Sequence, residues 1–303
     1  MKVAHPRFSS VITAAVAVVL SACQSLGTPS WELPPDVKTR SVNGYPIAYV
    51  DRGTGPTVAL VHGGLNDYRY WTPQMESLSS RFRTVAISLR HYYPEPWQGD
   101  GQFSIKQHSE DLAAFIESLG VGPVSVVAHS RGGSVAVDLA HSRPDLVRKL
   151  VLMDAALYPL IPPSEGASSA EVRIKRAKTT EAYFKKAEME GGLRYFFDDI
   201  NGAGAWNKLH EEQRQIRRQN AWTIVGGVND VEERVGCVDI GRFNIPVLLM
   251  EGERSPQWLK AIRQTFQKCL PSARWVTVPK GTHQMNHTNP AAFNELLIKY
   301  LSE

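Results

Sequence analysis

Cysteine and long apolar runs are both scarce in this chain, which has three cysteines among its 303 residues. Three cysteines cannot build the disulfide framework on which many small secreted domains rely. No apolar run reaches the roughly 20 residues of a membrane-spanning helix. No His, Cys and Asp cluster has the spacing of metal ligands, and no glycine-rich phosphate loop follows the first strands. The sequence therefore predicts neither a metal site nor a nucleotide cofactor.

An excess of charge of one sign is also missing. The chain has 34 Lys and Arg against 30 Asp and Glu, a net charge of +4. Without Lys2 and Arg7, which belong to a leader, 32 basic residues face the same 30 acidic ones, so nothing points to nucleic acid. The composition is globular, with 43% hydrophobic and 21% charged residues. The length allows one large domain with an insertion or two small domains.

The N-terminus has the pattern of an export signal. Lys2 and Arg7 precede an uncharged apolar run, residues 11–20, that is too short to cross a bilayer. The following Leu20-Ser21-Ala22-Cys23 resembles the lipobox of bacterial lipoproteins. This resemblance implies a lipoprotein signal peptide over residues 1–22 and acylation of Cys23. The alternative is an ordinary secretory signal cut near Ala22, with Cys23 incidental.

Lipidation would give the protein a membrane as a partner. Two or three fatty acyl chains, palmitate among them, hold a soluble domain stably at a membrane surface, whereas one chain is marginal. Gln24 resembles the outer-membrane sorting pattern of Gram-negative lipoproteins. We therefore expect an exported protein, lipid-anchored to the bacterial cell envelope on the periplasmic face of the outer membrane. The proline-rich residues 23–37 are predicted to be a tether.

The other two cysteines, Cys237 and Cys269, leave two possibilities open. In an exported and oxidising setting a disulfide between them is expected. Two separately buried thiols are the alternative, because the sequence does not place the two Cα atoms within bridging distance.

Strand and helix signals alternate from residue 40 to residue 301. Residues 40–51 alternate apolar and polar side chains around Asn43-Gly44, a hairpin signal. The order of the remaining elements predicts an α/β fold with a doubly wound, mostly parallel sheet. The predicted buried strands cover residues 57–61, 84–89, 123–129, 147–153, 245–250 and 274–278, and the predicted helices cover residues 71–80, 104–119, 134–141, 258–269 and 290–301.

Between the sixth and seventh strands the pattern changes to helices with charged faces and many aromatic side chains. We expect a helical lid here, over about residues 156–238, with most aromatics in its core and one or two at a pocket mouth. Arg214, Arg217 and Arg218 are expected on a solvated face near Glu211 and Glu212.

The apolar run that ends at His129 breaks at Ser130 between small residues. A serine at a sharp strand-to-helix turn has a strained backbone, so the residues two before and two after it must be small. Ala128 and Gly132 meet this requirement. The turn exposes the hydroxyl, and the helix start offers N–H groups to an oxyanion. Ser130 is therefore a candidate nucleophile.

This segment resembles the nucleophile elbow of the α/β-hydrolase family, with Ala128 where the G-x-S-x-G pattern has its first glycine. The buried strand at residues 57–61 ends in His62-Gly63-Gly64, which is similar to the end of the third strand in that family. The resemblance implies a hydrolase domain over residues 38–303. It also implies an oxyanion hole formed by the backbone N–H groups of Gly64 and Arg131.

A serine nucleophile needs a base and a carboxylate that orients the base. His283 follows the last strand in a Gly-x-His turn and matches the catalytic histidine of the family. His287 is its nearest rival. The chain order of serine, acid and histidine is that of the family.

The acid has several candidates. Most of the family places it after strand seven, where this chain has Ser255, which cannot balance an imidazolium charge. Branches such as the haloalkane dehalogenases place it after strand six, where Asp154 stands. Asp154 is therefore the first candidate, and Glu253 and then Glu251 remain alternatives.

The resemblance implies a serine hydrolase with a Ser130, His283 and Asp154 triad. It would cleave a carboxylic ester, or a related acyl bond, of a small molecule through an acyl-enzyme intermediate and without a cofactor. A carbon–carbon bond hydrolase or a perhydrolase of the same fold is one alternative. A ligand-binding lipoprotein without turnover, suggested by Ser255, is another.

Overall fold

The computed structural model describes the whole chain except residues 2–31, 98, 100, 163–169 and 229–234. The predicted leader, Cys23 and most of the tether lie outside the described residues. Of the helices in the described part, none has both the length and the apolar character that crossing a bilayer requires.

The centre of the molecule is an eight-stranded sheet in the order β1-β2-β4-β3-β5-β6-β7-β8. The first two strands form the predicted hairpin around Asn43-Gly44, and β2 pairs antiparallel with β4. All later pairs are parallel, so the predicted fold class is confirmed. The strands are β1 (Lys38–Val42), β2 (Tyr45–Arg52), β3 (Thr57–Val61), β4 (Arg83–Ile87), β5 (Val124–His129), β6 (Val147–Met153), β7 (Val247–Gly252) and β8 (Arg274–Val278).

Helices connect and cover these strands. The α-helices are α1 (Thr72–Leu78), α2 (Ile105–Ser118), α3 (Arg131–Ser142), α4 (Ala170–Lys185), α5 (Met189–Asn201), α6 (Glu211–Gln219), α7 (Thr223–Gly226), α8 (Cys237–Ile240), α9 (Gln257–Cys269), α10 (Met285–Thr288) and α11 (Pro290–Ser302). Short 3₁₀ turns lie at Tyr68–Trp71, Pro144–Leu146, Tyr158–Leu160 and Trp206–Lys208.

The strands are buried on both faces, as continuous apolar runs predict. In β3, Ala59 and Val61 pack into a core that includes residues of α2, α3 and α9. Val58 and Leu60, which alternate with them, pack into a second core with residues of α1 and α11. Two hydrophobic cores therefore hold the sheet, and the carboxyl ends of its parallel strands meet at one edge.

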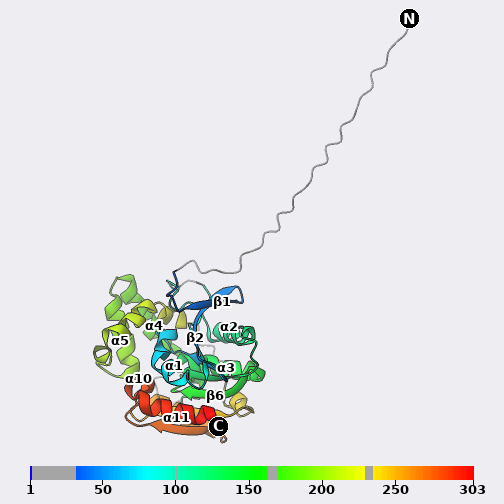
Figure 1. The fold of residues 1–303 in the computed structure, drawn as a ribbon. Coiled ribbons are helices and arrows are strands. Elements are labelled where there is room, and N and C mark those ends of the chain that lie inside the picture. The colour runs from blue at the N-terminus through cyan, green and yellow to red at the C-terminus, as the bar shows by residue number, and fades with distance from the viewer. Residues whose placement is uncertain (2–31, 98, 100, 163–169, 229–234) are drawn as a thin grey trace.

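Four helices between β6 and β7, α4 to α7, form what we call the cap. Figure 1 shows α4 and α5 together at one side of the molecule, away from α2 and α3. The cap has its own buried cluster, which includes Phe184, Phe197 and Trp206 and also takes in Leu65 from the loop after β3. The boundaries of about 156–238, and the opening motion that the word lid implies, remain predictions.

Cys237 begins α8 and Cys269 ends α9. The two residues form a disulfide with their Cα atoms 5.1 Å apart. The disulfide joins α8, in the segment that leads from the cap back to β7, with α9, which packs on the sheet.

Candidate active site

The turn between β5 and α3 places Ser130 in an unusual backbone conformation. Its φ is 52° and its ψ is −122°, a combination that costs free energy for any residue except glycine. The turn is possible because its neighbours are small. A Cβ on Gly132 would lie 2.3 Å from the backbone oxygen of His62, and one on Gly133 would lie 2.4 Å from the Cβ of Ala155.

Three sequence-predicted residues lie in a row at the carboxyl edge of the sheet. The Ser130 hydroxyl is 3.1 Å from Nε2 of His283, which lies in the turn after β8. Nδ1 of the same ring is 3.2 Å from Oδ2 of Asp154, the residue after β6. If Nδ1 carries the proton and donates it to the carboxylate, Nε2 is left to accept the serine proton. Both distances are within the reach of general base catalysis.

Ser255 donates a hydrogen bond to the carboxylate of Asp154. Its Oγ lies 2.5 Å from Oδ2, and it accepts in turn from the backbone N–H of Gly252 at 3.0 Å. Asp154 is 5% exposed, and burial raises the pKa of its carboxyl group. Hydrogen bonds from His283 and Ser255 act in the opposite direction on that pKa. Ser255, which stands where the resemblance places an acid, thus donates to a carboxylate at the end of the neighbouring strand.

The two alternative acids, Glu251 and Glu253, have other partners. Glu251 forms an ion pair with Arg263 at 2.9 Å. Glu253 accepts a hydrogen bond from the backbone N–H of Lys280 at 2.6 Å. Among the contacts of the described residues, neither carboxylate reaches the ring of His283, which pairs with Asp154 instead.

Two further histidines support the site without touching the serine hydroxyl. His129 donates through Nε2 to the backbone oxygen of His283 at 2.9 Å, and its ring stacks on Tyr70 with centroids 4.9 Å apart. His287, the rival base, donates through Nε2 to the backbone oxygen of Tyr70 at 3.0 Å. Sequence reasoning missed the contact between His129 and His283 because 154 positions separate the two residues.

The predicted oxyanion donors, Gly64 and Arg131, both border the cavity beside Ser130. Arg131 is the first residue of α3, and the first N–H groups of a helix point toward an incoming anion. His62 holds the loop that contains Gly64. It donates through Nδ1 to Gly63 O at 2.8 Å and accepts through Nε2 from Leu89 N–H at 3.0 Å.

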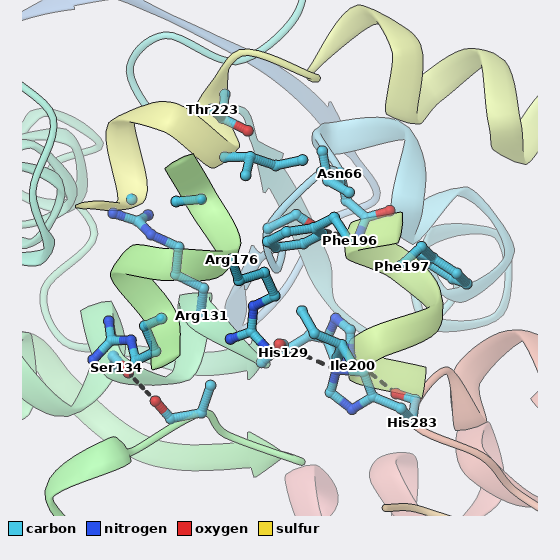
Figure 2. A pocket seen from close by; sticks show the side chains of 18 of the residues that line it. Asn66, His129, Arg131, Ser134, Arg176, Phe196, Phe197, Ile200, Thr223 and His283 are labelled. Atoms are coloured by element: carbon cyan, nitrogen blue, oxygen red, sulfur yellow. Dashed lines mark hydrogen bonds between the residues drawn. The ribbon is translucent and has the colours of Figure 1, made fainter. Parts of the chain in front are cut away.

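A cavity of about 130 Å³ opens above Ser130 and His283. Figure 2 shows Phe196, Phe197 and Ile200 of α5 over it, together with side chains from the sheet edge. Phe196 and Phe197 are thus aromatics of the cap that line the pocket. Arg131, Arg173 and Arg176 also line the cavity.

The prediction of a solvated arginine face on α6 is wrong for one residue. Arg217 is only 2% exposed, because it points inward over the ring of Phe197. It donates to the side-chain oxygen of Gln284 at 3.0 Å, next to His283. Arg218 does form the expected local pair with Glu211, at 2.5 Å. The sequence pattern alone could not separate the two, because they are neighbours on one short helix.

In the part of the chain that the structure describes, no three His, Cys, Asp or Glu side chains gather closely enough to hold a metal ion.

Comparison with known proteins agrees with this geometry at the level of family and fold. The model of the alpha/beta hydrolase family matches residues 58–296. The 2-(acetamidomethylene)succinate hydrolase of Mesorhizobium japonicum is 24% identical over 258 residues, which cover 79% of this chain and 86% of that protein. A putative carbamate hydrolase of Agrobacterium fabrum is 24% identical over 258 residues, which cover 81% of this chain and 93% of that protein.

Solved structures share the fold. An esterase from Thermogutta terrifontis superposes with a TM-score of 0.69 at 22% identity, covering 88% of this chain and 97% of that one. An enol-lactonase from Burkholderia xenovorans superposes with a TM-score of 0.72 at 20% identity, covering 88% of this chain and 100% of that one.

Proposed function

The chain belongs to the alpha/beta hydrolase family, and from this premise we propose that it is a serine hydrolase that cleaves a carboxylic ester of a small molecule. The observation that carries the proposal is the row of hydrogen bonds from Ser130 through His283 to Asp154, at 3.1 and 3.2 Å. The hydrolase class itself follows from the family and from relatives that are named as hydrolases. Because those names cover several acyl bonds, the ester is the finer part of the proposal.

In the first half-reaction Ser130 Oγ attacks the carbonyl carbon of the ester while its proton moves to Nε2 of His283. The carbonyl oxygen becomes negative and is held by the N–H groups of Gly64 and Arg131. Asp154 stabilises the imidazolium and keeps its Nδ1–H oriented. His283 then gives the proton to the leaving alcohol oxygen as the C–O bond breaks. The products are a free alcohol and an acyl ester on Ser130.

In the second half-reaction a water molecule takes the place of the alcohol. His283 accepts a proton from the water as the water oxygen attacks the acyl carbon. The bond to Ser130 Oγ then breaks, and the serine regains its proton from the imidazolium. The products are the carboxylic acid and the original enzyme, so atoms and charges balance over the cycle.

The test combines substrate turnover with covalent labelling. Ser130→Ala should lower ester turnover below roughly 1% of wild type and abolish labelling by a fluorophosphonate probe, since loss of a nucleophile costs orders of magnitude in rate. Ser142→Ala, at the other end of α3, is the matched control and should keep both ester turnover and labelling of Ser130. Its Oγ donates to the backbone oxygen of Asp138 at 2.8 Å, away from the cavity.

Other outcomes identify the alternatives. Labelling of Ser130 without turnover of any ester would favour a carbon–carbon bond hydrolase or a perhydrolase of the same fold. A folded wild-type protein that the probe does not label would contradict the serine hydrolase and favour a ligand-binding lipoprotein.

We also propose that the mature chain begins at Cys23, exported and lipid-anchored to the cell envelope. Support comes from the lipobox-like Leu20-Ser21-Ala22-Cys23 and from Gln24, which resembles the outer-membrane sorting pattern. Cys23→Ser should move the protein from the membrane fraction to the soluble fraction of cells. If the variant still sediments with membranes after a salt wash, the anchor is not at Cys23.

A further inference from the structure

The cavity beside Ser130 is lined by positive charge. Three arginines, Arg131, Arg173 and Arg176, contribute to its wall, and no aspartate or glutamate is among the described residues that line it. A wall of this composition attracts an anion, since charged groups in a partly buried site are screened less than at a surface. Arginine also suits carboxylates in particular, because its planar guanidinium can donate two parallel hydrogen bonds.

Arg176 of α4 is placed to bind a ligand. Its side chain is 11% exposed, and Nη1 donates at 2.6 Å to Asp199, whose own side chain is 45% exposed. The guanidinium also lies over the ring of Phe196, 5.5 Å from its centroid. A guanidinium has five N–H donors, and the Asp199 hydrogen bond uses one of them. The contact with Asp199 therefore orients Arg176 and leaves it capacity to donate to a ligand.

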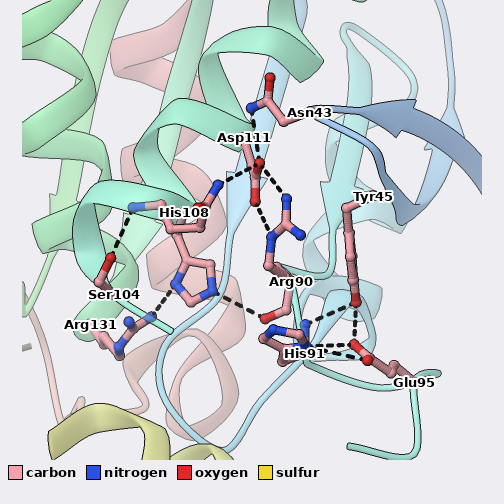
Figure 3. Close-up of polar contacts among 10 residues, drawn as sticks. Asn43, Tyr45, Arg90, His91, Glu95, Ser104, His108, Asp111 and Arg131 are labelled. Carbon is pink, nitrogen blue, oxygen red and sulfur yellow. Dashed lines mark hydrogen bonds and ion pairs between the residues drawn. The ribbon is translucent and has the colours of Figure 1, made fainter. Parts of the chain in front are cut away.

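Arg131 is fixed from behind by a neutral histidine. His108 of α2 donates through Nε2 to the backbone oxygen of Arg90 at 3.1 Å, so its Nδ1 is an acceptor, 3.0 Å from Nη1 of Arg131 (Figure 3). Burial and the charge of Arg131 hold the pKa of His108 well below its usual value, which keeps the ring neutral. The Arg131 guanidinium also lies 4.4 Å from the ring centroid of Phe103.

A fourth cation lies behind the wall. Arg217 is buried and, among the ion pairs of the described residues, has no carboxylate partner. It donates to Gln284, which lines the cavity beside His283. Its Nε has no hydrogen-bond partner, and burial lowers the pKa of Arg217 to about 10. A buried charge is costly unless something compensates it, and an anion in the cavity would contribute to that compensation.

We propose that the substrate is a small ester that carries a carboxylate, and that Arg176 of the cap binds this carboxylate while the ester carbonyl lies at Ser130. This inference rests on the proposed hydrolase function. Arg173, whose guanidinium lies 3.7 Å from the ring centroid of Tyr158, adds charge on the same side of the cavity. The cavity has a volume of about 130 Å³, so the substrate is small.

Two esters of equal shape test the charge preference. Monoethyl succinate and ethyl 4-oxopentanoate differ in having a carboxylate or a methyl ketone at the far end, and a pH-stat measures the acid released from either one. Wild type should hydrolyse the charged ester with the higher kcat/KM. Arg176→Gln should lower kcat/KM for the charged ester by about 10- to 100-fold, mainly through KM, since a hydrogen bond to a charged group contributes that much.

The neutral ester and a second variant provide the controls. Arg176→Gln should change kcat/KM for ethyl 4-oxopentanoate less than about twofold, whereas a merely structural role for Arg176 would lower both values equally. Lys178→Gln removes one positive charge from an exposed position on the same helix and should leave the preference unchanged. Arg176→Lys should restore part of the preference, because it restores the charge without the planar fork.

Failure of the inference can be told apart from failure of the proposed function. If Ser130 is labelled and both esters react equally well in wild type and in Arg176→Gln, the inference is overturned and the hydrolase stands. If neither ester reacts, calorimetric titration of the Ser130→Ala variant with monoethyl succinate decides. Binding that Arg176→Gln weakens about tenfold supports the carboxylate site, and binding that it does not change, or no binding, overturns it.

Discussion

At the carboxylate of Asp154, one oxygen accepts two hydrogen bonds and the other accepts none. Oδ2 is shared by His283 and Ser255, whereas Oδ1 is buried without a partner among the described residues. An ionised carboxylate in such a place depends on its two donors, because burial favours its neutral form. The carboxylate proposed to orient the base is thus itself held by a serine that is 101 positions away in the chain.

We predict that Asp154→Asn lowers ester turnover by up to about 10⁴-fold with little change in substrate binding, because an amide no longer favours the Nδ1–H tautomer of His283. Glu253→Gln should lower turnover only slightly. Steady-state kinetics of the two purified variants measure both effects. A large loss in Glu253→Gln together with a small one in Asp154→Asn would move the acid to strand seven.

Ser255 offers a control on the same geometry. Ser255 Oγ lies 2.5 Å from Oδ2 of Asp154. In the Asp154→Asn background, Ser255→Asp therefore brings a carboxylate back to the side of the site that Asp154 occupied. If the large loss comes from a missing charge beside His283, this second substitution should recover part of the turnover. No recovery in a folded double variant would mean that the carboxylate must stand at position 154 to act on His283.

At the scale of the elements, the turn between β5 and α3 allows little change of residue. Gly132 packs against the backbone of Val61 and His62, so a methyl group there would push α3, with Arg131, away from the loop that carries Gly64. We predict that Gly132→Ala lowers the free energy of unfolding by about 1–3 kcal/mol and also lowers turnover in the folded fraction. Urea unfolding and kinetics measure the two effects.

Gly236→Ala is the matched control for that substitution. A Cβ there would meet no atom within 4 Å, and its φ of −106° suits any residue. If Gly132→Ala and Gly236→Ala have equal effects on the free energy of unfolding and on turnover, close packing at the elbow does not require a glycine at position 132.

The elements themselves were predictable from local patterns. Continuous apolar runs such as residues 57–61 mark strands buried on both faces, and these runs form strands of the sheet. The small residues around Ser130 likewise reflect a local steric requirement. The sequence could therefore indicate both the α/β fold and a candidate nucleophile.

The contacts between elements were not predictable in this way. The choice between Asp154 and Glu253 depends on which strand end lies nearest His283, and no local pattern records that distance. The contact from His108 to Arg131 joins α2 to α3 and depends on how the two helices pack. The burial of Arg217 depends on which side of α6 meets the sheet domain. Each of these features comes from tertiary packing, which a single sequence does not display.

At the scale of the whole molecule, three buried histidines and the partly buried His287 are kept neutral by their surroundings. Burial lowers the pKa of His62 from its ordinary value of 6.5 to about 4 and does the same for His287. Burial also holds the pKa values of His108 and His129 well below 6.5. All four make hydrogen bonds that a neutral ring supplies, to backbone groups from distant parts of the chain.

We predict that the protein loses stability as the pH falls from 6.5 to about 4. In this window the unfolded chain protonates these histidines while the folded chain does not, so unfolding takes up protons and acid favours it. The depressed pKa of His62 alone corresponds to about 3 kcal/mol across the window. Asp154, whose pKa is raised by burial, acts in the opposite direction but is one group against four.

Urea unfolding at pH 7.5, 6.0 and 5.0 measures this effect, and the free energy of unfolding should fall at each step below pH 6.5. His287→Gln keeps a side-chain donor near the backbone oxygen of Tyr70 but cannot be protonated, so its stability should fall less steeply with acid than that of wild type. Its slope should be smaller because one fewer histidine takes up a proton on unfolding. Equal stability at pH 7.5 and 5.0 would mean that these histidines take up protons as readily in the folded protein as in the unfolded chain.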